Sequence, residues 1–272
     1  MPISSDSLDG KTALATGAGR GPGRAIAVGL ARPAARPAPV ARSRDELDQT
    51  AGQVRDLGAS ALVVPADVSG PGQLTGAVRR IRGELGDLDV LINNAAVVWP
   101  PGTSTSIDPA QWAAAININV VAVAKLSFLL LLPATIAAKW GRIVNISSGI
   151  AANPAGMLCA SAYATSKAAL EAHTINLAAE LAGTGITVSA FRPGSVDTAM
   201  QAWIRGQEPD QTGAVLHHRY TSSYQQGNLI SPQQSVQPLL AYLDTDATGH
   251  IWTASGPAWP SVTTPSNVWR PR

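Results

Sequence analysis

Short apolar segments alternate with longer helical patterns along most of the chain, and this alternation constrains the fold more than any other feature. Strand-like runs are expected at residues 12–16, 38–41, 61–64, 88–92, 142–146, 186–191 and 250–253. Helical patterns lie between them at 22–32, 44–57, 72–85, 109–138, 161–182 and 232–242. Near-continuous apolar strands separated by helices are typical of a parallel sheet covered on both faces. The sequence therefore predicts an α/β fold with a doubly wound parallel sheet of about seven strands and helices on both faces.

The chain has 272 residues, and no repeat or linker interrupts the pattern before residue 195. We therefore expect residues 1–272 to form a single domain, as α/β folds of this length commonly do. From 199 to 231 the pattern dissolves, and Gln, Gly, His, Tyr and Ser dominate. An irregular insert late in such a fold is usually a variable, mobile substrate loop. A plain surface loop is the alternative interpretation.

Composition argues against several classes of function. Hydrophobic residues make up 45% of the chain, ample for a core, and a net charge of +2 without a basic run gives no sign of a nucleic-acid partner. Cys159 is the only cysteine, so no internal disulfide is expected. His217 and His218 are neighbours in the sequence with no third metal ligand near them, so no metal site is expected. The most apolar run, 128–132, is much shorter than the about twenty residues of a membrane span. With no visible signal peptide, we expect a cytoplasmic protein that does not bind membranes.

The first expected strand ends in a cluster of glycines, Thr16-Gly-Ala-Gly-Arg-Gly-Pro-Gly23. Glycines between a strand and a helix let the backbone approach a diphosphate, and the helix N-terminus offers N–H donors and positive potential. A tight turn would explain a lone glycine cluster equally well. The position between a strand and a helix favours a dinucleotide site of the Rossmann type.

Further motifs give this cluster a family context. The spacing Gly17-x3-Gly21-x-Gly23 after a threonine resembles the short-chain dehydrogenase/reductase family. Other family motifs are matched in order by Asp67-Val68, Asn93-Asn94-Ala95-Ala96, Ser148, Tyr163-x3-Lys167 and Pro193-Gly194-x-Val196-x-Thr198. Together these matches cover roughly residues 8–198 and are highly specific. With the cofactor arguments below, they predict dinucleotide contacts by Gly17, Arg20, Gly21, Pro22, Gly23, Arg42, Asp67, Val68, Asn94, Ala95, Ala96, Tyr163, Lys167, Pro193, Gly194, Val196 and Thr198.

Tyr163 and Lys167 are four residues apart, so both side chains should lie on one helix face. An ammonium beside a phenol lowers the phenol pKa from about 10 towards working pH, where a general acid/base is most useful. An ordinary surface pair is the alternative, but Ser148, fifteen residues earlier after a strand, favours catalysis. By resemblance, Tyr163 exchanges a proton with the substrate oxygen, Ser148 orients that oxygen, and Lys167 holds the nicotinamide ribose.

An asparagine completes the family's catalytic set. Asn119 follows Trp112 by seven residues and precedes the small Ala122 by three, as in the family, where this residue supports a proton relay from a local break in its helix. Asn117 is the reserve candidate, and Ser147 is the competing serine. The predicted catalytic residues are Asn119, Ser148, Tyr163 and Lys167.

The end of the second strand bears on cofactor choice. An acid there binds the ribose 2′-hydroxyl of NAD, whereas an arginine suits the 2′-phosphate of NADP. The strand ends in Arg42 with no acid before it, and Arg20 adds a second cation from the glycine loop, so we expect NADP(H) rather than NAD(H). Pro37 and Pro39 depart from the family pattern. They are two residues apart, so both missing donors face the same neighbouring strand, and only one ladder should weaken.

These motifs predict an NADP(H)-dependent oxidoreductase that interconverts a ketone and a secondary alcohol. An epimerase or dehydratase of the extended branch would usually carry a larger C-terminal domain. A non-catalytic dinucleotide-binding regulator is the alternative from another class, and it would not need the four catalytic residues. The substrate is expected to be a small carbonyl or alcohol. The residues Trp99, Trp203, Tyr220 and Tyr224 suggest a partly aromatic pocket for it.

The surface composition predicts self-association. Charged residues are only 14% of the chain, compared with about 25% in a typical soluble domain. The helices expected at 109–138 and 161–182 are apolar or small on several faces, and a helix that is apolar all round must be buried all round. In the family these two helices pair across a two-fold axis. We expect a homotetramer, with a dimer as the alternative.

Overall fold

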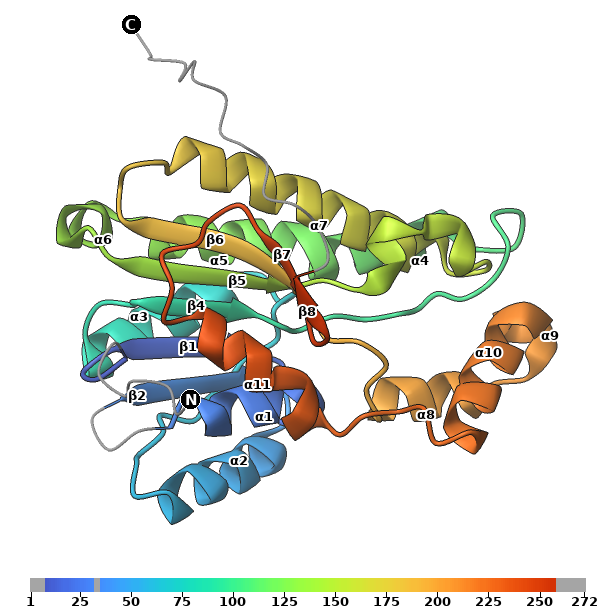
Figure 1. Cartoon of the computed structure of the whole chain (residues 1–272), viewed down its shortest axis with the longest axis horizontal. Helices are drawn as coiled ribbons and strands as arrows, with labels where there is room; N and C mark the ends of the chain where they lie inside the picture. The colour runs from blue at the N-terminus through green and yellow to red at the C-terminus, as the bar shows by residue number, and fades with distance from the viewer. Residues whose placement is uncertain (1–7, 32–34, 258–272) are drawn as a thin grey trace, which may run out of the picture.

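The computed structural model of this chain describes residues 8–31 and 35–257. One sheet forms its centre, with the strand order β3-β2-β1-β4-β5-β6-β7-β8 (Figure 1). The strands are β1 (Thr12–Thr16), β2 (Arg36–Ala41), β3 (Val64–Pro65), β4 (Val90–Asn93), β5 (Gly141–Ile146), β6 (Ile186–Arg192), β7 (Ile251–Thr253) and β8 (Gly256–Pro257). All neighbours from β3 to β7 are parallel, and β8 pairs antiparallel with β7. The predicted doubly wound sheet is confirmed, with one short antiparallel strand added at its edge.

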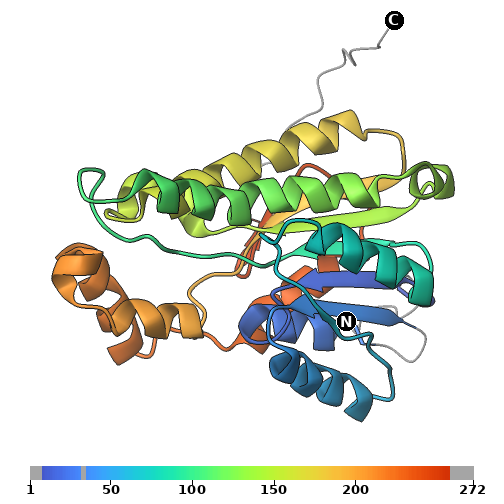
Figure 2. The ribbon, with the colours of Figure 1, turned by 180° about the vertical axis from the view of Figure 1, so that it is seen from behind.

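Helices cover both faces of the sheet. The helices of the described residues are α1 (Gly21–Gly29), α2 (Arg44–Asp56), α3 (Gln73–Leu85), α4 (Pro109–Ile116), α5 (Ala122–Leu130), α6 (Pro133–Ala138), α7 (Ser161–Glu180), α8 (Ala199–Arg205), α9 (Pro209–Thr212), α10 (Ala214–Gln225) and α11 (Pro232–Tyr242), and α8 to α10 lie away from the sheet. Helix α1 packs against α2 and α11 on one face (Figure 1). Helices α3, α5 and α7 cover the other face (Figure 2).

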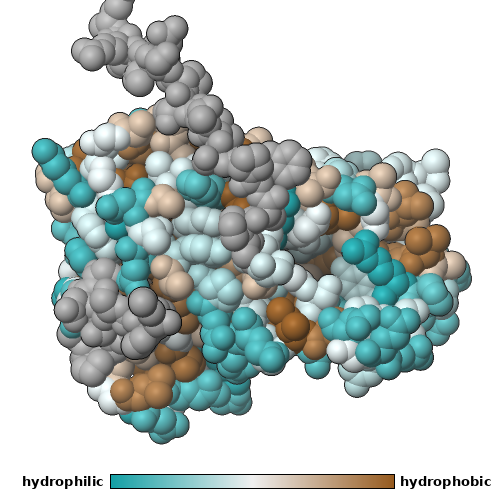
Figure 3. Space-filling view, viewed as in Figure 1, coloured by the Kyte–Doolittle hydropathy of each residue, from teal (hydrophilic) through white to brown (hydrophobic). Residues whose placement is uncertain are grey.

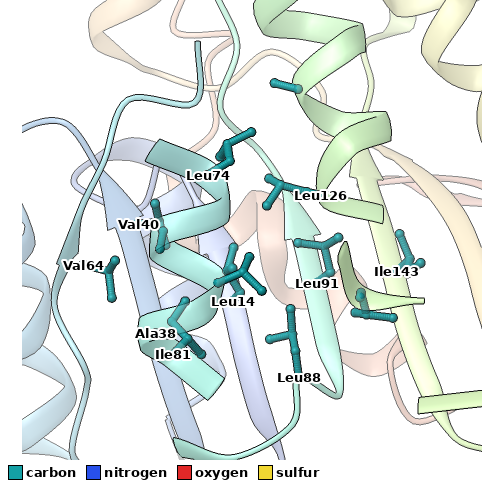
Figure 4. Close-up of a cluster of buried hydrophobic side chains, with 14 of the residues drawn as sticks. Leu14, Ala38, Val40, Val64, Leu74, Ile81, Leu88, Leu91, Leu126 and Ile143 are labelled. Atoms are coloured by element: carbon teal, nitrogen blue, oxygen red, sulfur yellow. The ribbon is translucent and has the colours of Figure 1, made fainter. Parts of the chain in front are cut away.

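Alternate residues of each strand enter two separate apolar clusters, one on each face. Leu91 of β4 packs with Ile81 of α3 and Leu126 of α5 (Figure 4). Its neighbour Ile92 joins the opposite cluster with Ile26 of α1. Side chains alternate along a strand, so a central strand must be apolar at consecutive positions to satisfy both layers. This requirement explains the unbroken apolar runs in the sequence.

The two prolines of β2 affect only one neighbour. Arg36 donates its N–H to the Lys11 carbonyl oxygen on the β1 side at 3.0 Å, whereas the Pro37 carbonyl oxygen accepts from Leu62 on the β3 side at 3.0 Å. The missing donors of Pro37 and Pro39 therefore face β3. Five residues of β1 pair with β2, but only two residues of β3 do. The prediction of one intact and one weakened ladder is confirmed, while the strand expected at 61–64 is reduced to Val64–Pro65.

The prediction of one uninterrupted helix at 109–138 is wrong. A π-helical segment, η1 (Asn117–Val121), separates α4 from α5, and α5 ends at Leu130. Pro133 starts α6, because proline is tolerated in the first turn of a helix and not in its interior. Residues 109–130 make 22 residues of helix that are long and apolar enough by composition to span a membrane. The most apolar 18 consecutive residues among them have a mean hydropathy of 1.8, and 39% of that stretch is buried within the chain. This segment lies over the sheet beside α3 and α7, so its apolar inner side is explained by packing.

The segment from 199 to 231 was predicted to be irregular, and the structure corrects this. It contains α8, α9 and α10, which extend from one end of the molecule (Figure 1, orange). Leu216 is the one described residue of α10 that is fully buried, so its helical periodicity in hydrophobicity is weak. Ile204 and Leu216 pack with Val98 and Met157 from the body of the fold. Tertiary contacts therefore stabilise helices that the local pattern does not indicate.

Candidate active site

Glycines at the end of β1 form a turn that leaves its backbone uncovered. Gly17 has a φ of 62° and Gly21 a φ of 53°, a region that glycine adopts without steric cost. A Cβ on Gly23 would lie 2.2 Å from the Gly17 carbonyl oxygen, so only glycine fits there. The Asn94 side chain braces the turn by donating to the carbonyl oxygens of Thr16 at 2.9 Å and Gly17 at 3.3 Å. This cradle at the N-terminus of α1 fits the diphosphate of a dinucleotide.

The other predicted dinucleotide contacts follow the carboxyl ends of the strands. Pro22 is in the first turn of α1, Ala95 and Ala96 follow β4, Asp67 and Val68 follow β3, and Pro193, Gly194, Val196 and Thr198 follow β6. The Ala95 N–H donates to the Thr16 hydroxyl at 3.0 Å. Parallel strands bring these ends to one edge, which is where open α/β sheets bind ligands.

Two arginines and one unpredicted acid lie at the β2 end of this edge. Hydrogen bonds from the Ser69 hydroxyl and N–H lower the pKa of Asp67, and the positive charge of Arg42 acts in the same direction. The Arg42 side chain is exposed. Arg20 is also exposed, and its guanidinium lies 3.4 Å from the carboxylate of Glu46. Glu46 comes from the first turn of α2, so inspecting the end of the second strand for an acid could not find it.

Ser148, Tyr163 and Lys167 meet at the end of β5. Ser148 caps the 3₁₀ turn η2 (Gly149–Ala152), and its hydroxyl lies close enough to the Tyr163 phenol to lower the pKa of that phenol. Lys167 is 3% exposed, and its Nζ donates to the Ile146 carbonyl oxygen at 2.6 Å and lies 5.7 Å from the centre of the Tyr163 ring. Ser147 instead donates to Glu171 at 2.6 Å, so the two adjacent serines serve different partners.

The expected lowering of the Tyr163 pKa is wrong for this structure. Burial raises the pKa of the phenol, and the hydrogen bond with Ser148 opposes that increase. The lysine ammonium is directed at a backbone carbonyl rather than at the phenol oxygen. Burial lowers the pKa of Lys167 to about 8, and the carboxylate of Glu171 opposes the decrease. A protonated phenol is the form that can donate a proton to a carbonyl oxygen.

Asn119 lies within the π-helical segment and is fully buried. Its amide nitrogen donates to the Val97 carbonyl oxygen at 2.8 Å and to the Ser166 hydroxyl at 3.0 Å, and its amide oxygen accepts from the Val97 N–H at 2.9 Å. Ser166 in turn donates to the Tyr163 carbonyl oxygen at 2.8 Å. Asn119 therefore connects the chain after β4 to the helix that carries Tyr163 and Lys167. Asn117 is at the start of the same segment and is only partly buried.

Space for a substrate adjoins these groups. A cleft of about 410 Å³ is lined by residues that include Gly149, Gly194, Ile230 and Ala254. An apolar cluster on the side of α8 and α10 contains Val98, Ile150, Met157, Ala160, Ala164, Ile204 and Leu216, with Tyr163, Met200 and Tyr220 packed against it. Of the four aromatic residues considered from the sequence, Tyr220 joins this cluster, whereas Trp203 is 39% and Tyr224 is 54% exposed.

A doubly wound sheet with a glycine cradle and a tyrosine–lysine pair at the same strand edge is the arrangement of an oxidoreductase that uses a nicotinamide dinucleotide. The family model for short chain dehydrogenases matches residues 11–209, so the chain belongs to the short-chain dehydrogenase/reductase family. It is an oxidoreductase of the kind that acts on CH–OH or C=O groups with NAD(P).

Known relatives agree in sequence and in fold. The ketoacyl reductase HetN of Nostoc sp. is 39% identical over 207 residues, which are 76% of this chain and 71% of the relative. The 3-oxoacyl-(acyl-carrier-protein) reductase FabG of Escherichia coli is 31% identical over 245 residues, which are 90% and 93% of the two chains. The structure of actinorhodin polyketide ketoreductase with NADPH superposes with a TM-score of 0.78 at 29% identity, covering 89% of this chain and 95% of that one.

Proposed function

We propose that the protein is an NADP(H)-dependent ketoreductase, which reduces a ketone to a secondary alcohol and catalyses the reverse oxidation. One observation carries the proposal: the side chains of Ser148, Tyr163 and Lys167 meet at the end of β5, on the strand edge that also holds the glycine cradle. Consumption of NADPH with a panel of ketones tests it. A protein that binds NADPH and reduces none of a broad panel would favour the non-catalytic regulator instead.

NADPH, when bound, supplies the hydride that reduces the carbonyl carbon. Tyr163 donates its proton to the carbonyl oxygen, and Ser148 holds that oxygen by a hydrogen bond. The phenolate that remains is stabilised by the ammonium of Lys167, one helical turn away. Asn119 braces the helix and the strand end against each other. In the oxidation the same phenolate accepts the alcohol proton.

The apolar cluster beside Tyr163 supports a substrate with apolar substituents on its carbonyl. Burial raises the pKa of the Tyr220 phenol, so this group stays a neutral hydrogen-bond donor at working pH. Its hydroxyl has a weak acceptor, the Met157 sulfur at 3.9 Å. Several relatives are named as ketoacyl or polyketide reductases, which supports a ketone as the substrate.

Arg42 and Arg20 support NADP(H) as the cofactor, because both cations lie at the strand edge where a 2′-phosphate would bind. Arg42→Ala is expected to reduce the preference for NADPH over NADH by about 1.5–3 kcal/mol, the value of a charge-assisted hydrogen bond. Binding titrations with both cofactors measure this difference. Equal affinities for NADPH and NADH in the unmodified protein would refute the preference itself.

Glu46→Gln is the matched test of opposite sign. The carboxylate of Glu46 pairs with Arg20 and would repel a 2′-phosphate, so its neutralisation should tighten NADPH binding. The pair is solvent-exposed, and we expect at most about 1 kcal/mol. NADH, which lacks the phosphate, should respond much less.

We further propose a homotetramer assembled through α4, α5 and α7. Phe128 of α5 is 59% exposed and Val121 of η1 is 39% exposed, and the outer side of α7 carries the exposed small residues Ala169 and Ala172. Apolar and small side chains on adjacent helices permit close packing between subunits. The contact should exceed the roughly 1,200 Å² at which stable interfaces begin.

Light scattering at micromolar concentration tests the assembly, and a stable 28.0 kDa monomer would contradict it. Phe128→Glu should dissociate the proposed contact between subunits, because it places a charge in an apolar interface. Leu57→Glu is the control, since Leu57 is 54% exposed at the end of α2, in the layer on the opposite face of the sheet. That control should leave the assembly unchanged.

A further inference from the structure

A buried ion pair lies directly behind the proton-transferring side chains. The Arg192 guanidinium donates to both oxygens of Glu171, from Nε at 2.8 Å and from a terminal nitrogen at 2.7 Å. The Ser147 hydroxyl donates to the same carboxylate at 2.6 Å. The two charged side chains are only 11% and 9% exposed. Such a buried pair is expensive to desolvate, and the fold gains little stability from it compared with apolar residues.

The three partners come from the three segments that build the site. Ser147 immediately precedes Ser148 at the end of β5. Arg192 is the last residue of β6 and immediately precedes Pro193 and Gly194. Glu171 is on α7, four residues after Lys167. One carboxylate therefore connects the serine segment, the tyrosine–lysine helix and the loop predicted to contact the dinucleotide.

Tyr163, Lys167 and Glu171 follow one another at intervals of four residues along α7. Side chains at this spacing lie on the same helix face, one turn apart. The charged and titratable groups around Lys167 are Tyr163 and Glu171 on its own helix and Arg192 of β6 beyond Glu171. The end of β5 contributes the neutral Ile146 carbonyl and Ser147 hydroxyl, and η1 contributes the neutral amide of Asn119. Glu171 is thus the negative group on the lysine's own helix face.

We infer that Glu171 is a positioning residue for the reaction: its buried carboxylate keeps Lys167 in the ammonium form while it holds the Ser147 and Arg192 segments in register. This inference rests on the proposed ketoreductase function. The direction agrees with the pKa of Lys167, which burial lowers to about 8 and the carboxylate raises. The ammonium form exists below this pKa. Loss of the carboxylate should lower the pKa further and deplete the ammonium form at neutral pH.

The test measures the Lys167 pKa directly. The sequence contains only four lysines, Lys11, Lys125, Lys139 and Lys167, so NMR of protein labelled at the lysine side chains is simple to assign. The Lys167 signal is the one lost in Lys167→Arg. In Glu171→Gln its titration midpoint should fall by about one unit or more, the effect of removing a neighbouring opposite charge. The alkaline limb of kcat/KM for ketone reduction should move to lower pH by a similar amount.

Controls separate the charge from packing. Glu171→Asp keeps a carboxylate and should keep the midpoint near that of the unmodified protein. Ser147→Ala removes one hydrogen bond and no charge, so it should leave the midpoint unchanged. If Glu171→Gln does not fold because Arg192 is left unpaired, Glu171→Gln/Arg192→Gln removes both charges, and the midpoint should still fall. An unchanged Lys167 midpoint in a folded variant without the carboxylate would overturn the inference. Because the NMR readout needs no turnover, this outcome is distinct from an unmodified protein that reduces no ketone, which would overturn the proposed function.

Discussion

Tyr163→Phe is expected to lower kcat for ketone reduction by about 10²- to 10⁴-fold, the contribution of one positioned proton-transfer group. The substitution removes only the phenol hydroxyl beside Ser148. The ring packs against the apolar cluster of the active site, and phenylalanine preserves this packing. The variant should therefore fold and bind NADPH like the unmodified protein. Single-turnover and steady-state rates of NADPH oxidation measure the loss.

Tyr242→Phe is the matched control for this variant. Tyr242 stacks on Trp252 with 4.4 Å between ring centres, in the layer of α11 and remote from Ser148 in the fold. Removal of its hydroxyl should leave turnover unchanged. A Tyr163→Phe enzyme with undiminished kcat would show that another group transfers the proton.

Gly23→Ala is expected to weaken dinucleotide binding strongly while the sheet remains folded. The new Cβ would lie 2.2 Å from the Gly17 carbonyl oxygen, so the backbone of the turn must shift. Overpacking costs about 1–3 kcal/mol, occasionally more, and this contact with backbone belongs at the upper end. A loss of about 3 kcal/mol corresponds to roughly 150-fold weaker binding. Titration of NADPH measures the change.

Gly76→Ala provides the control for that experiment. Gly76 is the fourth residue of α3, and a Cβ there would meet no atom within 4 Å. Alanine should stabilise this helix by about 0.4–1 kcal/mol through the unfolded chain and leave NADPH affinity unchanged. Equal NADPH affinity in both variants would contradict the assignment of the glycine cradle.

The apolar surface beside the proposed substrate site agrees with an apolar ligand. Figure 3 shows brown, apolar side chains at the right-hand end of the molecule, above the mainly teal surface where α8 to α10 lie in Figure 1. Leu158 is 56% and Val215 is 65% exposed. Neither residue had a predicted role, because an apolar residue in a sequence gives no sign by itself of whether it is exposed in the fold.

Spacing along the chain was enough to predict the elements that depend on local geometry. The strand–glycine–helix run placed Gly17 in the turn after β1 and Gly23 in the first turn of α1, and the interval of four residues placed Tyr163 and Lys167 on one helix face. The two-residue spacing of Pro37 and Pro39 predicted that only one ladder would weaken, because donor direction along a strand is fixed by its period of two, while the structure showed that the weakened ladder is the one with β3. The segment from 199 to 231 could not be predicted in this way. Its helices depend on contacts of Ile204 and Leu216 with Val98 and Met157, which lie far earlier in the chain.

Contacts between charged side chains from different elements could not be predicted from the sequence. The sequence by itself determined the doubly wound sheet, its glycine cradle and the tyrosine–lysine pair, because each depends on periodicity or spacing within one element. Only the tertiary structure decided that Glu46 meets Arg20, that Glu171 meets Arg192 and Ser147, and that burial raises the pKa of Tyr163. Hydrogen bonds, ion pairs and desolvation act over a few ångströms in space, and the distance between two residues along the chain does not determine that separation.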